Sequence, residues 1–282
     1  MYSCRCAGEG ARIHVTNTAP VPKLYTALPM KVVVIIPAAG LGTRMAVQSG
    51  LRPGQTTKQF AELGGKPILL HTIEKFAEVP QVDAIFIAVR ESERERLREL
   101  VAGQGTRPKI HVIVGGDHRQ ASVANALAAI SADADDIVLV HDAVRPFVDR
   151  EIIESVIVCA AKDGAAIAGV PAADTVKQVE RTANGAIITS TVPRERVVMA
   201  QTPQGFRYEL LKQAFDDAAQ DGFVGTDEAS LVERGGHQVA VVMGSARNIK
   251  ITTPADLELA EFYLSSGSPR RHGDTEEGLG RL

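Results

Sequence analysis

The fold is decided by residues 32–45, which read VVVIIPAAGLGTRM. The first five residues are an uninterrupted β-branched run, which is typical of a strand that is buried on both faces of a parallel sheet. The run ends in small residues, which let backbone N–H groups approach an anion closely, and Arg44 adds a positive charge. The stretch therefore predicts a buried strand that leads into a phosphate-binding loop.

The glycine spacing of this loop departs from the two commonest nucleotide motifs. A dinucleotide-binding fingerprint would have a third glycine where Met45 stands, and the phosphate loop Gly-x-x-x-x-Gly-Lys-Ser/Thr is absent. A glycine-rich turn without a ligand is the alternative interpretation.

Further along the chain, short β-branched runs alternate with amphipathic helical patterns. The strand-like runs cover residues 84–89, 110–114 and 137–140, and the helical patterns cover about 67–78, 91–101 and 118–130. Strands that are apolar on both faces, joined by helices long enough to cross over, give a mostly parallel sheet. We therefore predict an α/β, Rossmann-like doubly wound fold with helices on both faces, in which ligands bind at the carboxyl ends of the strands.

The second half of the chain is less regular. Residues 174–180 and 186–191 indicate two short strands around Asn184-Gly185, which is the strongest short-range signal for a hairpin turn. A two-stranded excursion is only marginally stable alone, so we expect this arm, about residues 173–195, to pack against a second subunit. Thr253-Pro254 followed by an acid predicts the start of a C-terminal helix.

The composition is that of a globular protein and narrows its partners. The 282 residues include 31 Lys and Arg against 34 Asp and Glu, a formal charge of −3, which excludes a basic nucleic-acid coat. The best apolar candidate for a membrane span is interrupted by Lys162 and Asp163, so neither a nucleic acid nor a membrane is an expected partner. Three cysteines cannot build a disulfide framework, which favours a cytoplasmic location.

Both ends of the chain lack the periodicity of its middle. Residues 1–29 carry glycines and prolines without an apolar pattern, and residues 265–282 mix Ser, Gly, Pro, Arg and Glu. We therefore expect a flexible N-terminal extension over 1–29, one domain over 30–264 and a disordered tail over 265–282.

A polar segment rich in glycine and proline, residues 46–57, separates the glycine loop from Lys58-Gln59-Phe60. Such a segment is expected to be mobile. If Arg44 and Lys58 face the same phosphate, they place fixed positive charge where a displacement at phosphorus builds up negative charge.

The glycine loop and Lys58-Gln59-Phe60 together resemble nucleotidyltransferases that activate sugar or polyol phosphates. Six later segments make the chain similar to the 2-C-methyl-D-erythritol 4-phosphate cytidylyltransferase family. In chain order they are Gly115-Gly116-Asp117 with Ser122, Val140 to Pro146 (VHDAVRP), Asp174-Thr175, Thr202-Pro203-Gln204, Thr226 to Ser230 (TDEAS) and Asn248-Ile249-Lys250. The resemblance covers residues 32–264 and implies the nucleotidyltransferase type of the doubly wound fold.

The resemblance implies a transfer reaction at phosphorus. A phosphate oxygen of methylerythritol phosphate attacks the α-phosphorus of CTP in line and releases pyrophosphate, a step of non-mevalonate isoprenoid biosynthesis. Mg²⁺ is the implied cofactor and is held mainly by the triphosphate, so no metal ligand is assigned to the chain. By similarity, Arg44 and Lys58 stabilise the pentacoordinate transition state, and Arg194 and Lys250 hold the substrate phosphate.

The other site residues follow from the same resemblance. Those expected to bind CTP are Pro37, Ala38, Ala39, Gly40, Leu41, Gly42, Gly116, Asp117, Ser122 and Ala143. Those expected to bind the second substrate are Asp142, Arg145, Thr175, Thr202 and Thr226. In the family, the arm that carries Thr175 and Arg194 comes from the neighbouring subunit, so a homodimer with arm exchange is implied. Thr226 has a second interpretation as a helix N-cap followed by acids that complement the helix dipole.

Two features depart from the family's pattern, and two other hypotheses stay open. Residues 46–57 are longer than the usual connection, and Thr57 stands where a proline commonly precedes the lysine. The first alternative is a cytidylyltransferase for another polyol phosphate, such as ribitol 5-phosphate, which would differ on the acceptor side. The second is a non-catalytic nucleotide-binding protein, against which the retained cations argue.

Overall fold

The computed structural model describes residues 30–40, 57–103 and 107–266. Several sequence-based expectations lie outside these residues. They are the N-terminal extension 1–29, the segment 46–56, most of the tail 265–282, and the site residues Leu41, Gly42 and Arg44.

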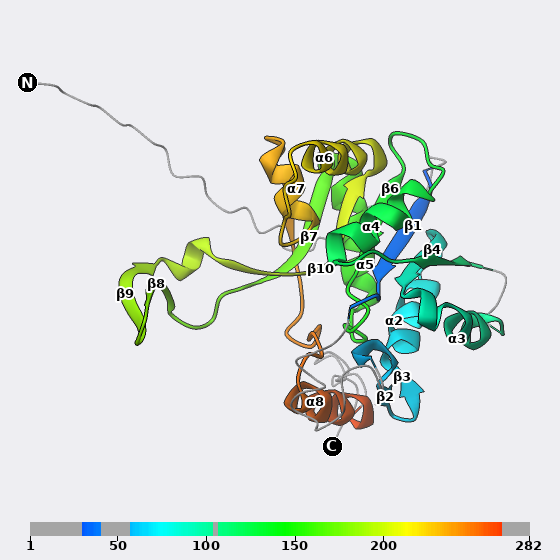
Figure 1. Cartoon of the computed structure of the whole chain (residues 1–282), viewed down its shortest axis with the longest axis horizontal. Helices are drawn as coiled ribbons and strands as arrows, with labels where there is room; N and C mark the ends of the chain where they lie inside the picture. The colour runs from blue at the N-terminus through cyan, green and yellow to red at the C-terminus, as the bar shows by residue number, and fades with distance from the viewer. Residues whose placement is uncertain (1–29, 41–56, 104–106, 267–282) are drawn as a thin grey trace, which may run out of the picture.

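Within the described residues, seven strands form the central sheet in the order β11-β7-β10-β6-β1-β4-β5 (Figure 1). Their bounds are β1 Val32–Pro37, β4 Val82–Val89, β5 Lys109–Val114, β6 Ile137–Val140, β7 Ala165–Pro171, β10 Val198–Arg207 and β11 Ala240–Met243. All neighbours pair in parallel except β10, which is antiparallel to both β6 and β7. The predicted mostly parallel, Rossmann-like sheet is therefore confirmed.

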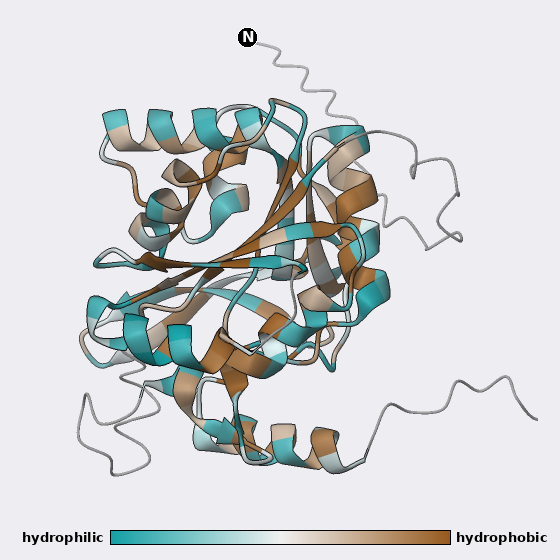
Figure 2. Ribbon diagram, turned by 90° about the vertical axis from the view of Figure 1, so that its right-hand side faces the viewer, coloured by the Kyte–Doolittle hydropathy of each residue, from teal (hydrophilic) through white to brown (hydrophobic). Residues whose placement is uncertain are grey.

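Helices cover both faces of this sheet. One face packs against α2 (Ile68–Ala77), α3 (Glu91–Val101) and α5 (Arg150–Asp163), and the other packs against α4 (Arg119–Ala128), α6 (Tyr208–Gln220) and α7 (Glu228–Arg234). Alternation along β1 shows the division, because Val34 and Ile36 join the first core whereas Val33 and Ile35 join the second. Figure 2 shows the hydrophobic residues gathered along the central strands. The double burial explains why β1 is apolar at every position.

The second half contains strands that the sequence did not reveal. Gln201, Thr202 and Gln204 are buried within β10, where their side chains bond to neighbouring loops and helices. These polar residues break the apolar pattern that marks the other strands. The reversed strand therefore looked irregular in sequence although it lies in the middle of the sheet.

A small separate core lies below the carboxyl ends of the strands. The hairpin β2 (Glu62–Leu63) and β3 (Lys66–Pro67) packs there with α8 (Pro254–Ser265) around Leu63, Ile251 and Ala260 (Figure 1). Thr253 caps α8 in a capping box with Asp256, as predicted from the sequence. This core fixes the segment that carries Lys58, which directly precedes β2, and the segment that carries Lys250, which lies between Ile249 and Ile251.

The predicted arm is a hairpin of β8 (Val176–Thr182) and β9 (Gly185–Val192), and it projects away from the sheet (Figure 1). Gly185 has a φ of 146°, a backbone conformation that side chains other than glycine rarely adopt. Val179, Ile187 and Ile188 are exposed on the hairpin, the last two by 63% and 60%. No helix in the described part of the chain has the length and apolar character needed to cross a membrane.

Candidate active site

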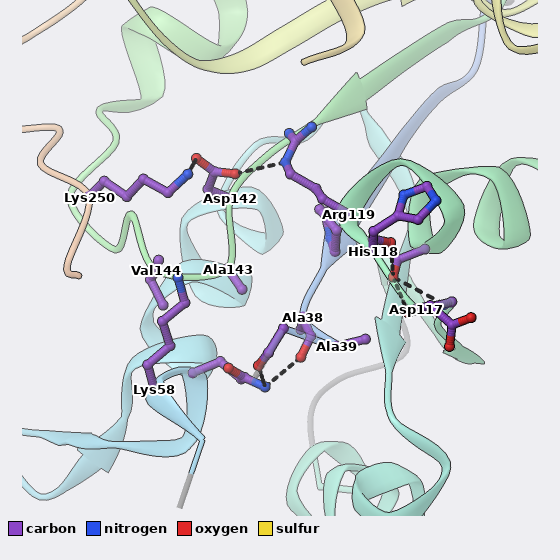
Figure 3. Close-up of a pocket in the computed structure, with 15 residues that line it drawn as sticks. Ala38, Ala39, Lys58, Asp117, His118, Arg119, Asp142, Ala143, Val144 and Lys250 are labelled. Carbon is purple, nitrogen blue, oxygen red and sulfur yellow. Dashed lines mark hydrogen bonds and ion pairs between the residues drawn. The ribbon is translucent and has the colours of Figure 1, made fainter. Parts of the chain in front are cut away.

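A cavity opens at the carboxyl ends of the parallel strands, where the doubly wound fold predicts a ligand (Figure 3). Five chain segments supply its walls: the end of β1, the loop between β5 and α4 with the start of α4, the turn after β6, η2 (Lys58–Phe60) and the segment after β11. The lining residues are Pro37, Ala38, Ala39, Gly40, Lys58, Gln59, Gly116, Asp117, His118, Arg119, Ser122, Asp142, Ala143, Val144 and Lys250.

One side of the cavity is made mainly of backbone. The Gln59 amide nitrogen donates to the carbonyl oxygens of Ala38 at 2.5 Å and Gly40 at 3.4 Å. Arg90 Nε donates to the carbonyl of Ala39 at 2.9 Å. These side chains hold the described part of the glycine loop in one conformation. Gln59 itself is buried, so the bonds are shielded from competition by water.

The loop between β5 and α4 packs tightly against this side. A Cβ on Gly115 would lie 2.5 Å from the Cβ of Ala39, and a Cβ on Gly116 would lie 2.5 Å from that of Ala121. Ser122 Oγ accepts a hydrogen bond from the Gly116 N–H at 3.1 Å. The absence of a side chain at Gly115 therefore lets the loop approach Ala39 at the end of β1, and its absence at Gly116 lets the loop approach Ala121 in α4.

The opposite side is charged and is centred on Asp142, just beyond the end of β6. Its carboxylate lies 2.9 Å from Lys250 Nζ and 3.3 Å from the Nε atoms of both Arg119 and Arg145. Burial alone would raise the pKa of Asp142, but Arg119, Lys250 and Arg145 hold it well below its ordinary value. The carboxylate is therefore ionised and fixes three cations. Figure 3 shows Lys250 and Arg119 meeting it from two different elements.

Arg119 extends this cluster to a second acid. Its Nη1 lies 2.7 Å from Oε1 of Glu228, the first residue of α7. Burial lowers the pKa of Arg119, but Glu228 and Asp142 outweigh it and raise that pKa further above its already high value. Burial also raises the pKa of Glu228, and Arg119 opposes that shift. The guanidinium thus bridges two buried carboxylates.

His141 and Thr202 support Asp142 from inside the sheet. The Asp142 N–H donates to Thr202 Oγ1 at 3.1 Å, and the same oxygen lies 3.0 Å from His141 Nδ1. The other imidazole nitrogen lies 3.1 Å from the carbonyl of Arg145, so Nε2 carries the proton and Nδ1 accepts from the Thr202 hydroxyl. Burial lowers the pKa of His141 to about 4, which keeps the ring neutral near pH 7.

The structure brings most of the predicted residues together. Described CTP-side residues from Pro37 to Gly40, with Gly116, Asp117, Ser122 and Ala143, line the cavity together with Lys58, Asp142 and Lys250. A second hollow shares Arg119, Asp142 and Lys250 with the cavity and adds Arg145, Thr202 and Thr226. The second hollow therefore gathers the predicted acceptor residues that lie outside the arm.

Two predicted residues lie elsewhere in this chain. Thr175 and Arg194 are exposed on the arm, and Arg194 Nη1 donates to the Ala173 carbonyl at 3.0 Å. The N-cap interpretation of Thr226 is wrong. The cap of α7 is Asp227, whose carboxylate accepts from the Ser230 N–H in a capping box. A carboxylate one residue later is the better placed acceptor for the first turn.

Sequence reasoning missed several members of the site, namely Gln59, Arg119, His141, Glu228 and Asn248. All five lie within or beside the quoted segments, but no local rule assigns them a role. Glu228 was interpreted as an acid that complements the helix dipole, and only the fold shows that its partner is Arg119, 109 residues away. An arginine at the start of a helical pattern, three residues after Gly116, was the signal available for Arg119.

Comparisons with known proteins agree with this geometry. The family model for IspD, 2-C-methyl-D-erythritol 4-phosphate cytidylyltransferase, matches residues 32–266. A protein of that name from Acidobacterium capsulatum is 59% identical over 86% of this chain and 100% of its own length. Another from Solibacter usitatus is 53% identical over 86% of this chain and 98% of its own.

Solved structures give the same result. A 4-diphosphocytidyl-2C-methyl-D-erythritol synthase from Anaerococcus prevotii has a TM-score of 0.70 at 28% identity, over 84% of this chain and 99% of that one. A 2-C-methyl-D-erythritol 4-phosphate cytidylyltransferase from Francisella tularensis has a TM-score of 0.67 at 38% identity, over 82% and 99%. With the motif order, the doubly wound sheet and the cavity at its carboxyl edge, these matches show that the chain belongs to the 2-C-methyl-D-erythritol 4-phosphate cytidylyltransferase family.

Proposed function

We propose that this chain transfers the cytidylyl group of CTP to 2-C-methyl-D-erythritol 4-phosphate, giving 4-diphosphocytidyl-2-C-methyl-D-erythritol and pyrophosphate in non-mevalonate isoprenoid biosynthesis. The observation that carries the proposal is a single cavity in a chain of this family with a backbone-lined side and a cationic side. A nucleotide and a phosphorylated acceptor need these two environments next to each other.

The backbone side is the proposed CTP site. Gly116, Ser122 and the segment from Pro37 to Gly40 line this side of the cavity, and we assign the slot among them to the pyrimidine, which is smaller than a purine. Polar groups of the slot can separate cytosine from uracil, because leaving a buried donor or acceptor unpaired costs ~1–3 kcal/mol. Leu41 and Gly42 complete this proposed set.

The cationic side is the proposed acceptor site. Lys250 and Arg145 are fixed by Asp142, so they are oriented before the substrate arrives. Thr202 and Thr226 border the same hollow and offer hydroxyl groups to a polyol. The attacking phosphate is already ionised near neutral pH, and for that reason the reaction requires no general base from the chain.

Lys58 stands between the two sides. It lines the cavity from η2, and Figure 3 shows it extending towards Ala143 and Val144. We assign it, with Arg44, to the charge that develops at the α-phosphorus when the phosphate oxygen attacks and the pyrophosphate oxygen leaves. A fixed donor at such a position contributes ~3–4 kcal/mol to transition-state stabilisation.

A divalent cation fits this site as part of the nucleotide. Among the described residues, no three His, Cys, Asp or Glu side chains gather into a metal-binding group, and the buried Asp142 is already bound by three cations. Mg²⁺ commonly keeps substrate phosphates and waters as ligands, so the triphosphate oxygens would hold it. When bound, it neutralises the phosphate charge and makes the α-phosphorus more electrophilic.

The arm supports a homodimer in which each subunit completes the site of the other. Val179, Ile187 and Ile188 expose apolar surface on a hairpin that leaves the body of the chain, and Thr175 and Arg194 lie on this arm (Figure 1). We assign both residues to the partner's acceptor site. An exchanged arm would cover the exposed residues and bring a further cation to the substrate phosphate.

Mixing two inactive variants tests this arrangement. Arg194→Ala damages the arm and Lys58→Ala damages the body, so neither variant alone should turn over at a useful rate. Subunit exchange between them creates one intact site in each mixed dimer, and about a quarter of the wild-type rate should return. If the two variants carry different affinity tags and co-purify as mixed dimers, but the mixture stays inactive, the arm does not contribute to the site.

Pyrophosphate release tests the activity itself. The purified chain is assayed with Mg²⁺ and CTP, with methylerythritol 4-phosphate, ribitol 5-phosphate or no acceptor, and with UTP and ATP as nucleotide controls. Turnover with CTP and methylerythritol phosphate alone is the expected result. Preference for ribitol phosphate would replace the acceptor in the proposal, and binding of CTP without turnover would remove the enzyme assignment.

We further propose that residues 30–264 are the catalytic unit and that the protein works in the cytoplasm. The family match over 32–266 and the three cysteines support these two statements. A chain shortened to residues 30–266 should keep the turnover of the full chain, and fractionation of the source cells should place the protein with cytoplasmic enzymes.

A further inference from the structure

Glu228 carries a buried charge for which the proposed reaction has no direct use. The side chain is almost completely buried at the start of α7, and it does not line the cavity. Its Oε1 accepts from Arg119 at 2.7 Å, whereas its Oε2 has no hydrogen-bond partner among the described residues. Burying a carboxylate with one oxygen unpartnered costs stability. A cost of this kind is retained where the charge has a function.

Arg119 is the group on which this charge acts. Its guanidinium lines both the CTP-side cavity and the acceptor-side hollow, and it lies between the carboxylates of Glu228 and Asp142. The contact with Glu228, at 2.7 Å, is shorter than the contact with Asp142, at 3.3 Å. Glu228 therefore draws Arg119 towards α7 and away from a closer pairing with Asp142.

The position of Arg119 determines whether Asp142 can bind Lys250 and Arg145. Asp142 has two oxygens: Oδ1 faces Arg119, and Oδ2 faces Lys250 and Arg145. A guanidinium released from Glu228 can bind both oxygens of a carboxylate in the fork geometry that arginine prefers. Such a pairing would occupy both oxygens of Asp142 with Arg119 and would displace Lys250 from Oδ2.

We propose that Glu228 is a positioning residue for the acceptor phosphate site: it holds Arg119 to one side, so that Asp142 remains the anchor of Lys250 and Arg145. This role rests on the proposed cytidylyl transfer and adds to it a residue that touches neither substrate. Its effect is directional, because the displaced cations belong to the acceptor side. In the proposed reaction CTP lies mainly against the wall opposite Asp142, so its binding should depend less on Glu228 than acceptor binding does.

The main test is Glu228→Gln, which keeps the shape and removes the charge. The KM for methylerythritol phosphate should rise about tenfold, as loss of a charge-assisted contact implies, while the KM for CTP changes by less than about threefold. Glu233→Gln on the same helix is the matched control, since Glu233 is exposed and outside the cluster. Equal changes in both KM values, or a change in melting temperature alone, would reduce Glu228 to a structural residue and overturn the proposal.

A double variant tests the route of the effect. If Glu228 acts only through Arg119, then Glu228→Gln combined with Arg119→Gln should have the acceptor KM of Arg119→Gln alone within about twofold. Effects that multiply would show that Glu228 acts by another route. Glu228→Asp keeps the charge at a shorter reach and should give an acceptor KM between wild type and Glu228→Gln. It also serves if the glutamine variant does not fold.

A crystal structure of Glu228→Gln gives a readout that needs no turnover. The proposal expects both guanidinium nitrogens of Arg119 on Asp142 and Lys250 displaced from its 2.9 Å contact. Unchanged positions of both cations would overturn it. Wild-type protein without turnover, but with this rearrangement in the variant, would refute the proposed function and leave the positioning role established.

Discussion

The two sides of the cavity are built by different means. The proposed CTP side is built from glycines and other small residues packed closely together, where Gly115 and Gly116 allow an approach to Ala39 and Ala121 that any side chain would prevent. The acceptor side is a cluster of charged side chains around Asp142, drawn from segments that lie far apart in the chain. Backbone fixes a shape and thereby selects a ring, whereas fixed charge attracts and orients a phosphate.

The variant with the largest expected effect lies between the two sides. Lys58→Ala should lower kcat by about 100- to 1,000-fold while KM for CTP rises only a few-fold, because the ammonium acts on charge that develops in the transition state. Initial rates of pyrophosphate release over a range of CTP concentrations measure both. Lys66→Ala is the control, since Lys66 pairs with Glu74 outside the cavity. Equal losses in kcat and in CTP affinity would show that Lys58 binds CTP in the ground state and does not act mainly on the transition state.

Removal of Lys250 separates the two sides most cleanly. Lys250→Ala should raise the KM for methylerythritol phosphate by about 30-fold, because it deletes a charged contact to a dianion, and should leave the KM for CTP within about threefold. Lys212→Ala is the control, because it removes a lysine from an exposed ion pair with Asp216 away from the cavity and should change neither KM. If the KM for CTP rises as much as the KM for methylerythritol phosphate, the cavity is not divided into a CTP side and an acceptor side.

The complementary change is made on the backbone side. Gly116→Ala places a methyl group 2.5 Å from the Cβ of Ala121, so the loop or the start of α4 must move by about an ångström to restore ordinary van der Waals contact. Overpacking of this kind costs ~1–3 kcal/mol, and KM for CTP should rise about tenfold with little change for the acceptor. Gly65→Ala would be a poor control because its φ is positive, whereas Gly103→Ala meets open space. A rise in acceptor KM with unchanged CTP KM would reverse the assignment.

The smallest effect near neutral pH concerns His141, which supports the acceptor side from beneath. Burial lowers its pKa from 6.5 to about 4, so between these values the unfolded chain binds a proton that the folded chain excludes. Stability from this residue is complete above pH 6.5 and falls by ~3 kcal/mol as the pH decreases to 4. Urea unfolding of wild type and His141→Asn at pH 7, 5.5 and 4.5 checks this, with exposed His237→Asn as control. If the free energy of unfolding decreases equally with falling pH in wild type and in His141→Asn, the pH dependence does not come from His141.

The contrast between the sides also explains what the sequence could predict. The β1 strand and its glycine loop are contiguous, so the 32–45 stretch was enough to predict the strand and the ligand end of the sheet. The charged side joins Arg119, Asp142, Glu228 and Lys250, whose pairing depends on strand order and helix placement. No spacing rule connects residues separated by 109 positions, as Arg119 and Glu228 are.

The fold shows the same limit. Strands β4 and β6 were predicted with nearly the observed bounds, whereas β7 and β11 were not predicted although they are also apolar. Strand β10 was not predicted, because the buried polar residues Gln201, Thr202 and Gln204 stand where apolar residues would mark a core strand. Polar residues buried for function hide a strand from any test of hydrophobic periodicity.

A crystal structure of this chain with a non-hydrolysable CTP analogue and methylerythritol 4-phosphate would test the division of the cavity. The pyrimidine should lie in the slot beside Gly116 and Ser122, and the acceptor phosphate should lie on Lys250 and Arg145. A triphosphate lying on the Asp142 side, or an acceptor phosphate in the glycine slot, would contradict the division of the cavity on which the proposed reaction rests.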